Sequence, residues 1–503
     1  MANQNSTLPK QIESFWRGTA ESFSYAKLDK DIKVDVAVAG GGIAGITAAY
    51  LLAKEGKKVA LLEARELMSG TTGFTTAKLT AQHNLIYDEL INRYGQEQAE
   101  LYYQANMEGI ALIKKLTEEL NIDCDLEEED AFVYTKEEED RSKFHKEAEA
   151  YEKLGIEGEF LENLPLDMDI EAAIMMRYQA QFNPVKYLNA LLKEIEKLDG
   201  KMYENTRVMD VEGKKNVKVT TENDKTVTCQ QVIFATHFPV YDPDEFFAGN
   251  LQPESSYALA VNTNKEFPDG MYISADAPKR TLRRIKDNSK SYVLVGGESH
   301  STGDGKSSDE RYEELQKFAE EQFDATEIMY RWSSHDLISS DRVPFIGPVN
   351  SNEPNVYAVT GFGKWGLASA AIGAALLKDL ILENDNPYEE LFSPRRDIQE
   401  MNDVEPEQGE DDDHSDASTV EKPEDLNRNQ GAVVEVNGKE VGAFRDENGK
   451  VHLMNLSCTH MGCDVEWNDG DCTWDCPCHG SRFKGTGEVI EGPALEPLEK
   501  TDK

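Results

Sequence analysis

Between residues 33 and 395, short apolar runs alternate with longer stretches in which apolar residues recur every three or four positions. The apolar runs predict buried strands, the longer stretches predict amphipathic helices, and glycine-rich turns separate the two. The predicted strands are VDVAVAG (34–40), KKVALLEA (57–64), QQVIFAT (230–236), SYVLVGG (291–297) and NVYAVTG (355–361). The predicted helices cover 43–56, about 85–120 and 190–198. This alternation predicts an α/β, Rossmann-like core with a largely parallel sheet.

Two segments interrupt this pattern, and we expect them to form an inserted α+β domain. Residues 86–175 are mainly helical and acidic, whereas residues 245–330 have the alternation of strands. The remaining core would consist of residues 33–85, 176–244 and 331–395, preceded by an N-terminal extension over residues 1–32.

The composition changes sharply after residue 395. Residues 397–425 hold 13 acidic residues and one lysine. We expect 396–425 to be an acidic linker, because such a stretch cannot bury enough apolar surface to fold alone. Residues 426–503 then contain short strands (AVVEV, EVGAF and KVHLMNL), separated by Asn-Gly pairs at 437–438 and 448–449. Asn-Gly pairs are strong hairpin signals, so a small all-β domain is predicted.

The charge of the chain excludes some classes of function. Of 503 residues, 95 are acidic and 53 basic, a formal net charge of −42. Proteins that bind nucleic acids or anionic membranes need a cationic surface, so we expect neither partner. Salt adaptation and a merely acidic surface explain the charge equally well. The apolar segment 34–53 contains three consecutive glycines, which suit a strand, turn and helix better than a membrane span. The N-terminus has no secretory pattern, and a cytoplasmic protein is expected.

Residues 40–45 fit the motif G-x-G-x-x-G, directly after one predicted strand and at the start of a helix. The next strand ends in Glu63, which completes the context of a dinucleotide site. Gly40 would permit the tight turn, Gly42 the approach of the pyrophosphate, and Gly45 the packing of the helix on the strand. The helix N-terminus would attract the phosphates, and Glu63 would accept hydrogen bonds from the ribose.

A second G-x-G-x-x-G, at 361–366, is not followed by a strand that ends in an acid. This segment is therefore a poor match to a second nucleotide-binding fold. The N-terminus of its helix could instead stabilise the negative charge of a reduced flavin. With these motifs, residues 33–395 resemble the D-amino-acid-oxidase/glycine-oxidase-like flavoproteins. Further matching segments are SGTTG (69–73), VIFATH (232–237) and DRVPFIGP (341–348). Ala235-Thr236-His237 departs from the more usual Ala-x-Gly of that family.

This resemblance implies FAD as the cofactor, an inserted substrate domain, and an amine or amino acid as the kind of substrate. The implied FAD contacts are Gly40, Gly42, Ile43, Ala44, Gly45, Glu63, Ala64, Thr71, Thr72, Val208, Ala235, Thr236, Gly361, Gly363, Lys364 and Trp365. Lys364 is also the first catalytic candidate, because a lysine there could bind a substrate carboxylate or stabilise the flavin anion; a solvated surface lysine is the alternative. His83 is a candidate for acid–base chemistry and Arg283 for holding an anionic substrate. A structural histidine and surface ion pairing are their alternatives.

Five of the seven cysteines lie between residues 458 and 478. Clustering in so large a chain indicates a metal site rather than a secreted disulfide scaffold. The runs 458–460 (CTH) and 476–479 (CPCH) each supply a cysteine and a histidine. A [2Fe–2S] centre with two cysteines on one iron and two histidines on the other needs this set. Zinc can take the same residue types, but C-x-H is shorter than the cysteine spacing of zinc fingers.

Residues 426–503 closely resemble Rieske domains, of the disulfide-bearing type found in respiratory cytochrome complexes. The resemblance implies Cys458, His460, Cys476 and His479 as cluster ligands and a disulfide between Cys463 and Cys478. It also places the hydroxyl of Ser481 as a hydrogen-bond donor to sulfur, and it puts Phe483 where such domains carry a tyrosine donor. Fewer donors should lower the reduction potential of the cluster.

Together the motifs predict an FAD-dependent oxidoreductase that exchanges electrons between a small-molecule substrate, FAD and a Rieske cluster. A flavin takes two electrons and the cluster takes one, which suits a dehydrogenase that serves an outside acceptor. The reverse flow, from cluster to flavin, fits the sequence equally well. A redox carrier or sensor without substrate turnover is the alternative from another class. The motifs leave the external electron donor or acceptor unspecified.

Overall fold

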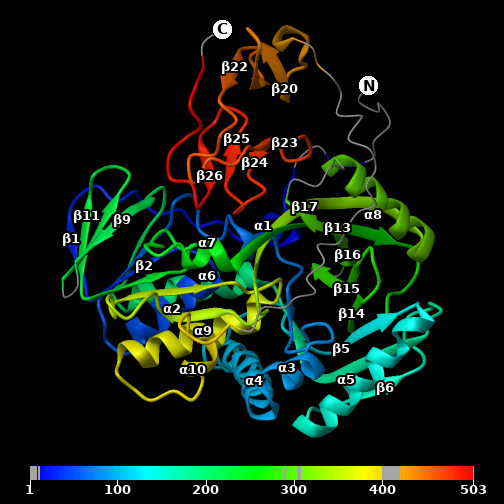
Figure 1. Ribbon diagram of the computed structural model, residues 1–503. Helices are drawn as coiled ribbons and strands as arrows, with labels where there is room; N and C mark the ends of the chain where they lie inside the picture. Colours follow the sequence, from blue (N-terminus) through cyan, green and yellow to red (C-terminus); the bar gives the residue numbers. More distant parts are fainter. Residues whose placement is uncertain are drawn as a thin grey trace.

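The computed structural model describes residues 8–9, 12–213, 216–287, 290–302, 307–398, 420 and 422–501 (Figure 1). Its core is a six-stranded sheet in the order β18-β19-β12-β2-β3-β8. The strands are β2 (Val36–Ala39), β3 (Val59–Leu62), β8 (Lys201–Tyr203), β12 (Gln231–Phe234), β18 (Phe345–Pro348) and β19 (Val356–Thr360). All neighbours pair in parallel except β18, which is antiparallel to β19 at the edge. The α/β core is therefore confirmed.

Helices α2 (Ile43–Lys54), α6 (Pro184–Lys197), α9 (Gly366–Ile381) and α4 (Gln96–Glu119) accompany this sheet. Helix α2 packs against α6 and α9, and α9 also packs against α4. Nearly all of α2 is buried. Helices α2 and α9 are apolar on every side, as is typical of helices buried in a core. A smaller mixed sheet adjoins the core in the order β1-β11-β10-β9, in which β1 is parallel to β11 and the other neighbours are antiparallel. Its strands are β1 (Ile32–Lys33), β9 (Val208–Glu212), β10 (Val217–Thr221) and β11 (Thr226–Cys229).

The two inserted segments and β4, which precedes the first of them, form one nine-stranded sheet, in the order β17-β13-β16-β15-β14-β5-β7-β4, with β6 paired to β7. The strands are β4 (Lys78–Leu79), β5 (Glu127–Thr135), β6 (Gly158–Leu161), β7 (Ala172–Gln181), β13 (Leu251–Thr263), β14 (Met271–Ser274), β15 (Arg280–Asp287), β16 (Lys290–Ser301) and β17 (Ala325–Ser339). Helices α3 (Tyr87–Tyr94), α5 (Arg141–Leu154) and α8 (Ser308–Phe323) belong to the same segments. Strand β5 joins them by pairing in parallel with β14.

Two of the expected domain boundaries are wrong in position. The boundaries at 175 and 330 fall inside β7 and β17, which continue to Gln181 and Ser339. Both strands pair within the nine-stranded sheet along their whole length, β7 with β5 and β17 with β13. The apolar pattern therefore continues past the expected boundaries.

Residues 12–32 are part of the large domain and not a separate extension. Helix α1 (Phe15–Thr19) places the side chains of Phe15 and Trp16 in the main hydrophobic core, where both are at most 2% exposed. The indole of Trp16 also donates a hydrogen bond to the carbonyl of Thr75 (2.6 Å). Burying two aromatic side chains contributes several kcal/mol, which accounts for the docking of this segment.

The C-terminal domain is all-β, as expected. One antiparallel sheet contains β20 (Gln430–Val436), β21 (Lys439–Arg445) and β22 (Val451–Met454). The other contains β23 (Glu466–Asn468), β24 (Thr473–Asp475), β25 (Arg482–Lys484) and β26 (Val489–Glu491). Asn437 and Gly438 both have positive φ (54° and 77°), as a tight hairpin between β20 and β21 requires. Figure 1 shows β23–β26 next to the large domain and β20–β22 farther away from it.

The predicted linker lies mostly outside the described residues, which omit 399–419 and 421. Its first residue, Arg396, is held by the large domain, since its guanidinium contacts both carboxylate oxygens of the buried Asp341 at 2.8 Å. Short helical segments complete the fold: η1 (Thr71–Phe74), η2 (Glu138–Asp140), α7 (Phe246–Asn250), α10 (Glu389–Phe392) and η3 (Pro423–Asp425).

Candidate functional site

The glycine-rich loop between β2 and α2 has the geometry of a phosphate-binding turn. Gly40 has a φ of 105°, and a Cβ there would lie 2.1 Å from the carbonyl oxygen of Ala235. At Gly45 a Cβ would lie 1.9 Å from the carbonyl oxygen of Gly40, so the helix could not pack on the strand. The N-cap residue of α2 is Gly42, which has no side chain to accept from the amides of the first turn. This turn therefore keeps amide donors for an anionic ligand.

Glu63 holds this loop in place. One carboxylate oxygen accepts the amide of Gly41 (2.7 Å) and the other accepts the amide of Arg65 (2.9 Å). The amide of Ile43 is bound in turn by the hydroxyl of Thr72 (3.0 Å). Glu63 thus fixes the shape of the loop, besides lining the cavity where a ribose would lie.

A long cavity runs from this loop toward α9. Fourteen of the sixteen expected FAD contacts line it: Gly40, Gly42, Ile43, Ala44, Glu63, Ala64, Thr71, Thr72, Val208, Ala235, Thr236, Gly361, Gly363 and Lys364. Gly45 lies behind the loop, and Trp365 lines the next cavity instead. The close approaches at Gly40 and Gly45, together with the glycine at the N-cap of α2, fit the pyrophosphate of a dinucleotide. We call this space the FAD cavity.

A second cavity adjoins the FAD cavity and lies under the nine-stranded sheet. The two share a wall made of Thr71, Thr75, Asp336, Gly363 and Lys364. The rest of the second cavity comes from residues 74–86, from strands β13, β15, β16 and β17, and from Ile273, Lys279, Arg342 and Trp365. We call it the substrate cavity, because a molecule in it would lie next to the FAD cavity across the shared wall.

Lys364 is paired inside this wall. It has a φ of 73°, and its ammonium lies 2.6 Å from a carboxylate oxygen of Glu254. Although burial opposes it, this ammonium holds the pKa of Glu254 below its usual range. Asp336, the neighbour of Glu254 across β13 and β17, is half-buried, and its desolvation raises its pKa to about 6. Sequence reasoning missed both carboxylates, because only the register of the two strands brings them to Lys364.

His83 has a different place from the one expected of an acid–base group. Its Nε2 donates to the carbonyl of Thr80 (2.9 Å), so its Nδ1 accepts the hydroxyl of Tyr102 (2.7 Å). Burial lowers its pKa to about 3. The neutral ring stacks on Trp365 at 5.1 Å between centroids. With both nitrogens engaged, His83 supports Trp365 and has no free nitrogen for a substrate.

The prediction that Arg283 holds an anionic substrate is also not met, because Arg283 lines neither cavity. Its guanidinium is buried behind the substrate cavity, donates to the carbonyl of Ala77 and lies 5.0 Å from the ring of Trp16. Lys78 does line the substrate cavity, as do Lys279, Arg342 and Lys364. Its ammonium donates to the hydroxyl of Thr281 (2.5 Å) and lies 5.4 Å above the ring of Trp365.

Lys78 is half-buried. Burial, and then the nearby charge of Arg283, lower its pKa to about 7. In the part of the chain that the structure describes, no carboxylate forms an ion pair with Lys78. Sequence reasoning missed this residue. The only signal in the sequence was its place among the threonines of residues 71–80.

The two predicted cluster loops lie side by side in the C-terminal domain. Cys458 and His460 follow β22, and Cys476 and His479 lie between β24 and β25. The rings of the two histidines are 4.9 Å apart, and the thiols of Cys458 and Cys476 are within hydrogen-bond reach of each other. Nδ1 of His460 is buried without a hydrogen-bond partner, as a nitrogen that ligates a metal would be. The set therefore fits a [2Fe–2S] cluster.

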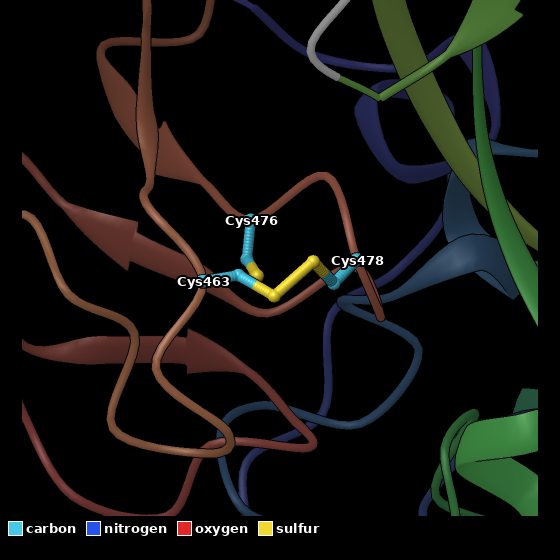
Figure 2. Close-up of side chains that lie close together, drawn as sticks. All are labelled: Cys463, Cys476 and Cys478. Carbon is cyan, nitrogen blue, oxygen red and sulfur yellow. A yellow bond between two sulfur atoms is a disulfide. The ribbon is translucent and has the colours of Figure 1, made fainter.

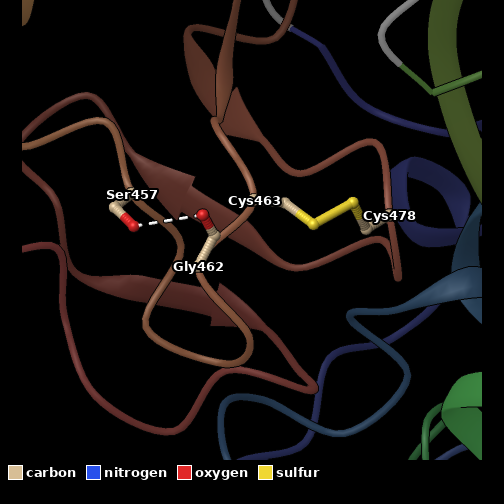
Figure 3. The surroundings of a disulfide bond; sticks show 4 residues. All are labelled: Ser457, Gly462, Cys463 and Cys478. Atoms are coloured by element: carbon tan, nitrogen blue, oxygen red, sulfur yellow. Dashed lines mark hydrogen bonds between the residues drawn. A yellow bond between two sulfur atoms is a disulfide. The ribbon is translucent and has the colours of Figure 1, made fainter.

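Cys463 and Cys478 form the expected disulfide. Figure 2 shows it beside Cys476, whose sulfur lies within 4.8 Å of both disulfide sulfurs. Because Cys463 and Cys478 are bonded to each other, neither competes with Cys458 for a metal. Figure 3 shows how the first loop closes: the hydroxyl of Ser457 donates to the carbonyl of Gly462 (3.2 Å) next to the disulfide.

The surroundings of the cysteines match the expected hydrogen-bond donors. The buried hydroxyl of Ser481 accepts the amide of Ala494 (2.9 Å) and hydrogen-bonds to Cys458. Phe483 is fully buried in the hydrophobic cluster that contains Trp474, Cys458 and Cys476. It offers no hydroxyl at that position.

One aromatic side chain lies between the two candidate cofactor sites. Phe238 lines the FAD cavity, directly after Ala235, Thr236 and His237 at the end of β12. Its ring meets the rings of His460 and His479 edge to face, at 5.9 and 6.4 Å between centroids. The histidine side of the cluster site is therefore packed against the wall of the FAD cavity.

Comparison with known proteins agrees with both sites. Residues 35–380 match the family model of FAD dependent oxidoreductases (DAO), and residues 417–502 match that of the Rieske [2Fe-2S] domain. Over all of both chains, 511 aligned residues are 43% identical to a Bacillus subtilis (strain 168) protein named as a Rieske 2Fe-2S iron-sulfur protein, YhfW.

Solved structures show the same fold. Glycine oxidase from Geobacillus kaustophilus matches with a TM-score of 0.61 at 20% identity, covering 73% of this chain and 99% of its own. L-proline dehydrogenase from P. horikoshii matches with a TM-score of 0.60 at 20% identity, covering 72% and 97%. None of the helices described is both long and apolar enough for a membrane crossing. The chain thus belongs to the DAO family of FAD-dependent oxidoreductases, binding FAD in its large domain and a [2Fe–2S] cluster in its Rieske domain.

Proposed function

We propose that this protein is an amine or amino-acid dehydrogenase that passes electrons from its substrate, through FAD, to the Rieske cluster. The observation that carries the proposal is the position of Phe238, which lines the FAD cavity and contacts both cluster histidines. Glycine oxidase, L-proline dehydrogenase and L-amino acid deaminase from Proteus vulgaris, which share the fold, support the class of substrate. In the proposed arrangement Cys458, His460, Cys476 and His479 hold the cluster.

The substrate cavity supports an enzyme rather than a carrier, because charged groups converge in it beside the FAD cavity. Lys78 offers a positive charge without a carboxylate partner among the described residues, which would attract an anionic group of the substrate. Asp336, whose pKa burial raises to about 6, would exchange a proton near neutral pH. FAD, when bound, supplies the ring that takes up the two electrons of the oxidised substrate.

The paired groups at the shared wall would orient the reacting molecules. Lys364 stays close to Glu254, so its charge is balanced before a substrate binds. Trp365, held by His83 on one face and near Lys78, forms an apolar wall that excludes water.

An anaerobic screen of amino acids and secondary amines tests the proposal. A substrate should bleach the visible absorption of the flavin and, in the same sample, produce the EPR signal of the reduced cluster. Bleaching without that signal would separate the cluster from substrate oxidation. If dithionite reduces both centres but no compound of the panel bleaches the flavin, the protein is a carrier or works in the reductive direction.

A further inference from the structure

The FAD cavity is closed by residues of the Rieske domain. Ile490, Glu491, Gly492, Pro493 and Leu495, at the end of β26 and just after it, line the same cavity as the glycine-rich loop. We call residues 490–495 the closing segment. The glycine oxidase and proline dehydrogenase structures match only about three quarters of this chain, the large domain's share. This wall is therefore an addition made by the fused domain.

Glu491 is the charged residue of the closing segment and is fully engaged by the large domain. Its carboxylate lies 2.9 Å from the guanidinium of Arg65, which lines the cavity two residues after Glu63. Although burial opposes it, Arg65, Arg482, His335 and His237 hold its pKa at about 2. The carboxylate is thus ionised and paired at neutral pH.

The backbone of β26 is bound in the same place. Arg207, another residue of the cavity wall, donates to the carbonyl of Val489 (3.1 Å). The closing segment therefore lies between two arginines of the large domain, Arg65 and Arg207, which both face the cavity.

A second group of contacts fixes the Rieske domain away from the cavity. The hydroxyl of Ser333 donates to Asp471 (2.6 Å), and the hydroxyl of Ser308 donates to the side chain of Asn468 (2.7 Å). Gly470 sits so close to the start of α8 that a Cβ there would lie 2.2 Å from the Cβ of Ser308. Gly470 does not have a positive φ, so its backbone conformation does not require glycine. The close contact with Ser308 does. The two domains dock at van der Waals distance at this point.

From these contacts we propose that the FAD site is bipartite: the Rieske domain, through residues 490–495, completes the wall of the FAD cavity, and FAD leaves only when the domains separate. Docking at Gly470 and retention of FAD are then coupled, although Gly470 is not a residue of the cavity. The proposal concerns how the cofactor is held, so it does not depend on the substrate or on the direction of electron flow.

The test prevents docking without touching the cavity. Gly470→Trp and Ser308→Trp each place a large side chain in the contact, one from either domain, so a folding defect in one domain cannot explain both. In each full-length variant, the rate of FAD release is measured from the fluorescence of free flavin. The EPR spectrum of the dithionite-reduced cluster reports whether the Rieske domain is intact.

A matched pair of small changes serves as the control. Gly470→Ala adds the Cβ that meets Ser308, and Ser308→Gly removes the Cβ that it meets. The double variant should release FAD more slowly than Gly470→Ala alone. Ser308→Gly alone gives the separate effect of losing the hydroxyl that donates to Asn468.

We expect both tryptophan variants to release FAD several-fold faster while the EPR signal of the cluster persists. Release at the unaltered rate in both tryptophan variants would overturn the proposal, because the large domain alone would then retain FAD. A failure of the double variant to slow release below that of Gly470→Ala would also overturn it, since the effect would not come from this contact.

Discussion

The hydroxyl of Ser481 lies between the amide of Ala494 and the sulfur of Cys458, which makes it a test of how the protein tunes its cluster. Each hydrogen bond to sulfur stabilises the extra negative charge of the reduced state. Ser481→Ala should therefore lower the reduction potential. A net hydrogen bond is worth about 1 kcal/mol, which for one electron corresponds to some tens of millivolts. Phe483→Tyr should raise the potential by a similar amount if its hydroxyl reaches a sulfur.

Protein-film voltammetry measures both shifts, and Ser457→Ala is the matched control. Ser457 belongs to the same pair of loops, but its hydroxyl bonds to the carbonyl of Gly462 and not to a sulfur. Its loss should leave the potential unchanged. Equal potentials for Ser481→Ala and the unaltered protein would remove Ser481 from the set of donors.

Lys78 allows a prediction about stability and pH. Its pKa falls from 10.5 to about 7 in the folded protein, first because of burial and then because of Arg283. Between these two pH values the unfolded chain binds more protons than the folded one, so this group makes stability rise with pH across the interval. Replacing it with methionine removes the cost of burying the charge. Lys78→Met should thus raise the thermal midpoint at pH 7, and the gain should shrink toward pH 10.

The control for this effect is Lys33→Met, at an exposed lysine on β1. Its thermal midpoint should differ little from that of the unaltered protein at either pH. A gain from Lys78→Met that is the same at pH 7 and pH 10 would show that packing, and not the charge, is responsible.

At the scale of elements, the turn between β2 and α2 should control FAD without affecting the cluster. A side chain at Gly42 would begin 3.0 Å from the hydroxyl of Thr72, which binds the amide of Ile43, and would enter the space expected for the pyrophosphate. Gly42→Val should therefore be purified with little FAD and a full cluster, as absorbance and iron analysis would show. Gly249→Val is the control, because nothing lies within 4 Å of its added Cβ. Loss of iron together with FAD would contradict this separation.

The elements that could be predicted from the sequence are those whose signal is local. The strand, turn and helix around Gly40 and the hairpin at Asn437-Gly438 each depend on neighbouring residues, and both are present. Two domain boundaries were misplaced because β7 and β17 each continue in the nine-stranded sheet beyond the expected boundary. No local pattern marks such a division.

The residues that were missed become neighbours only in the folded chain. Asp336 and Glu254 meet Lys364 through the register of β13 and β17, and Lys78 meets Trp365 across almost 300 positions. Glu491 reaches Arg65 from the other domain. His83 and Arg283 were placed near the site correctly but given the wrong contacts, since burial and hydrogen-bond partners are not visible in a sequence.

At the scale of the whole molecule, the net charge of −42 should make stability depend on salt. Charges of one sign repel each other in the compact state, and about 1 M salt reduces the screening length to about 3 Å. We therefore expect the thermal midpoint to rise steadily as NaCl is added from low concentration. Sucrose of the same osmolality is the control, because it does not screen charge. A midpoint that falls with salt would mean that the ion pairs outweigh the repulsion.

The closing segment also has a consequence for how the protein acquires its cofactors during synthesis. Every residue of the large domain precedes residues 490–495 in the chain, and domains form in order as the ribosome releases them. The pocket for the flavin is thus complete except for the closing segment, and open, while the Rieske domain is still being made. FAD can enter the open cavity during this interval, which ends when β26 folds onto the large domain. Maturation would then follow a fixed sequence, with the flavin installed first and sealed in by the domain that carries the iron.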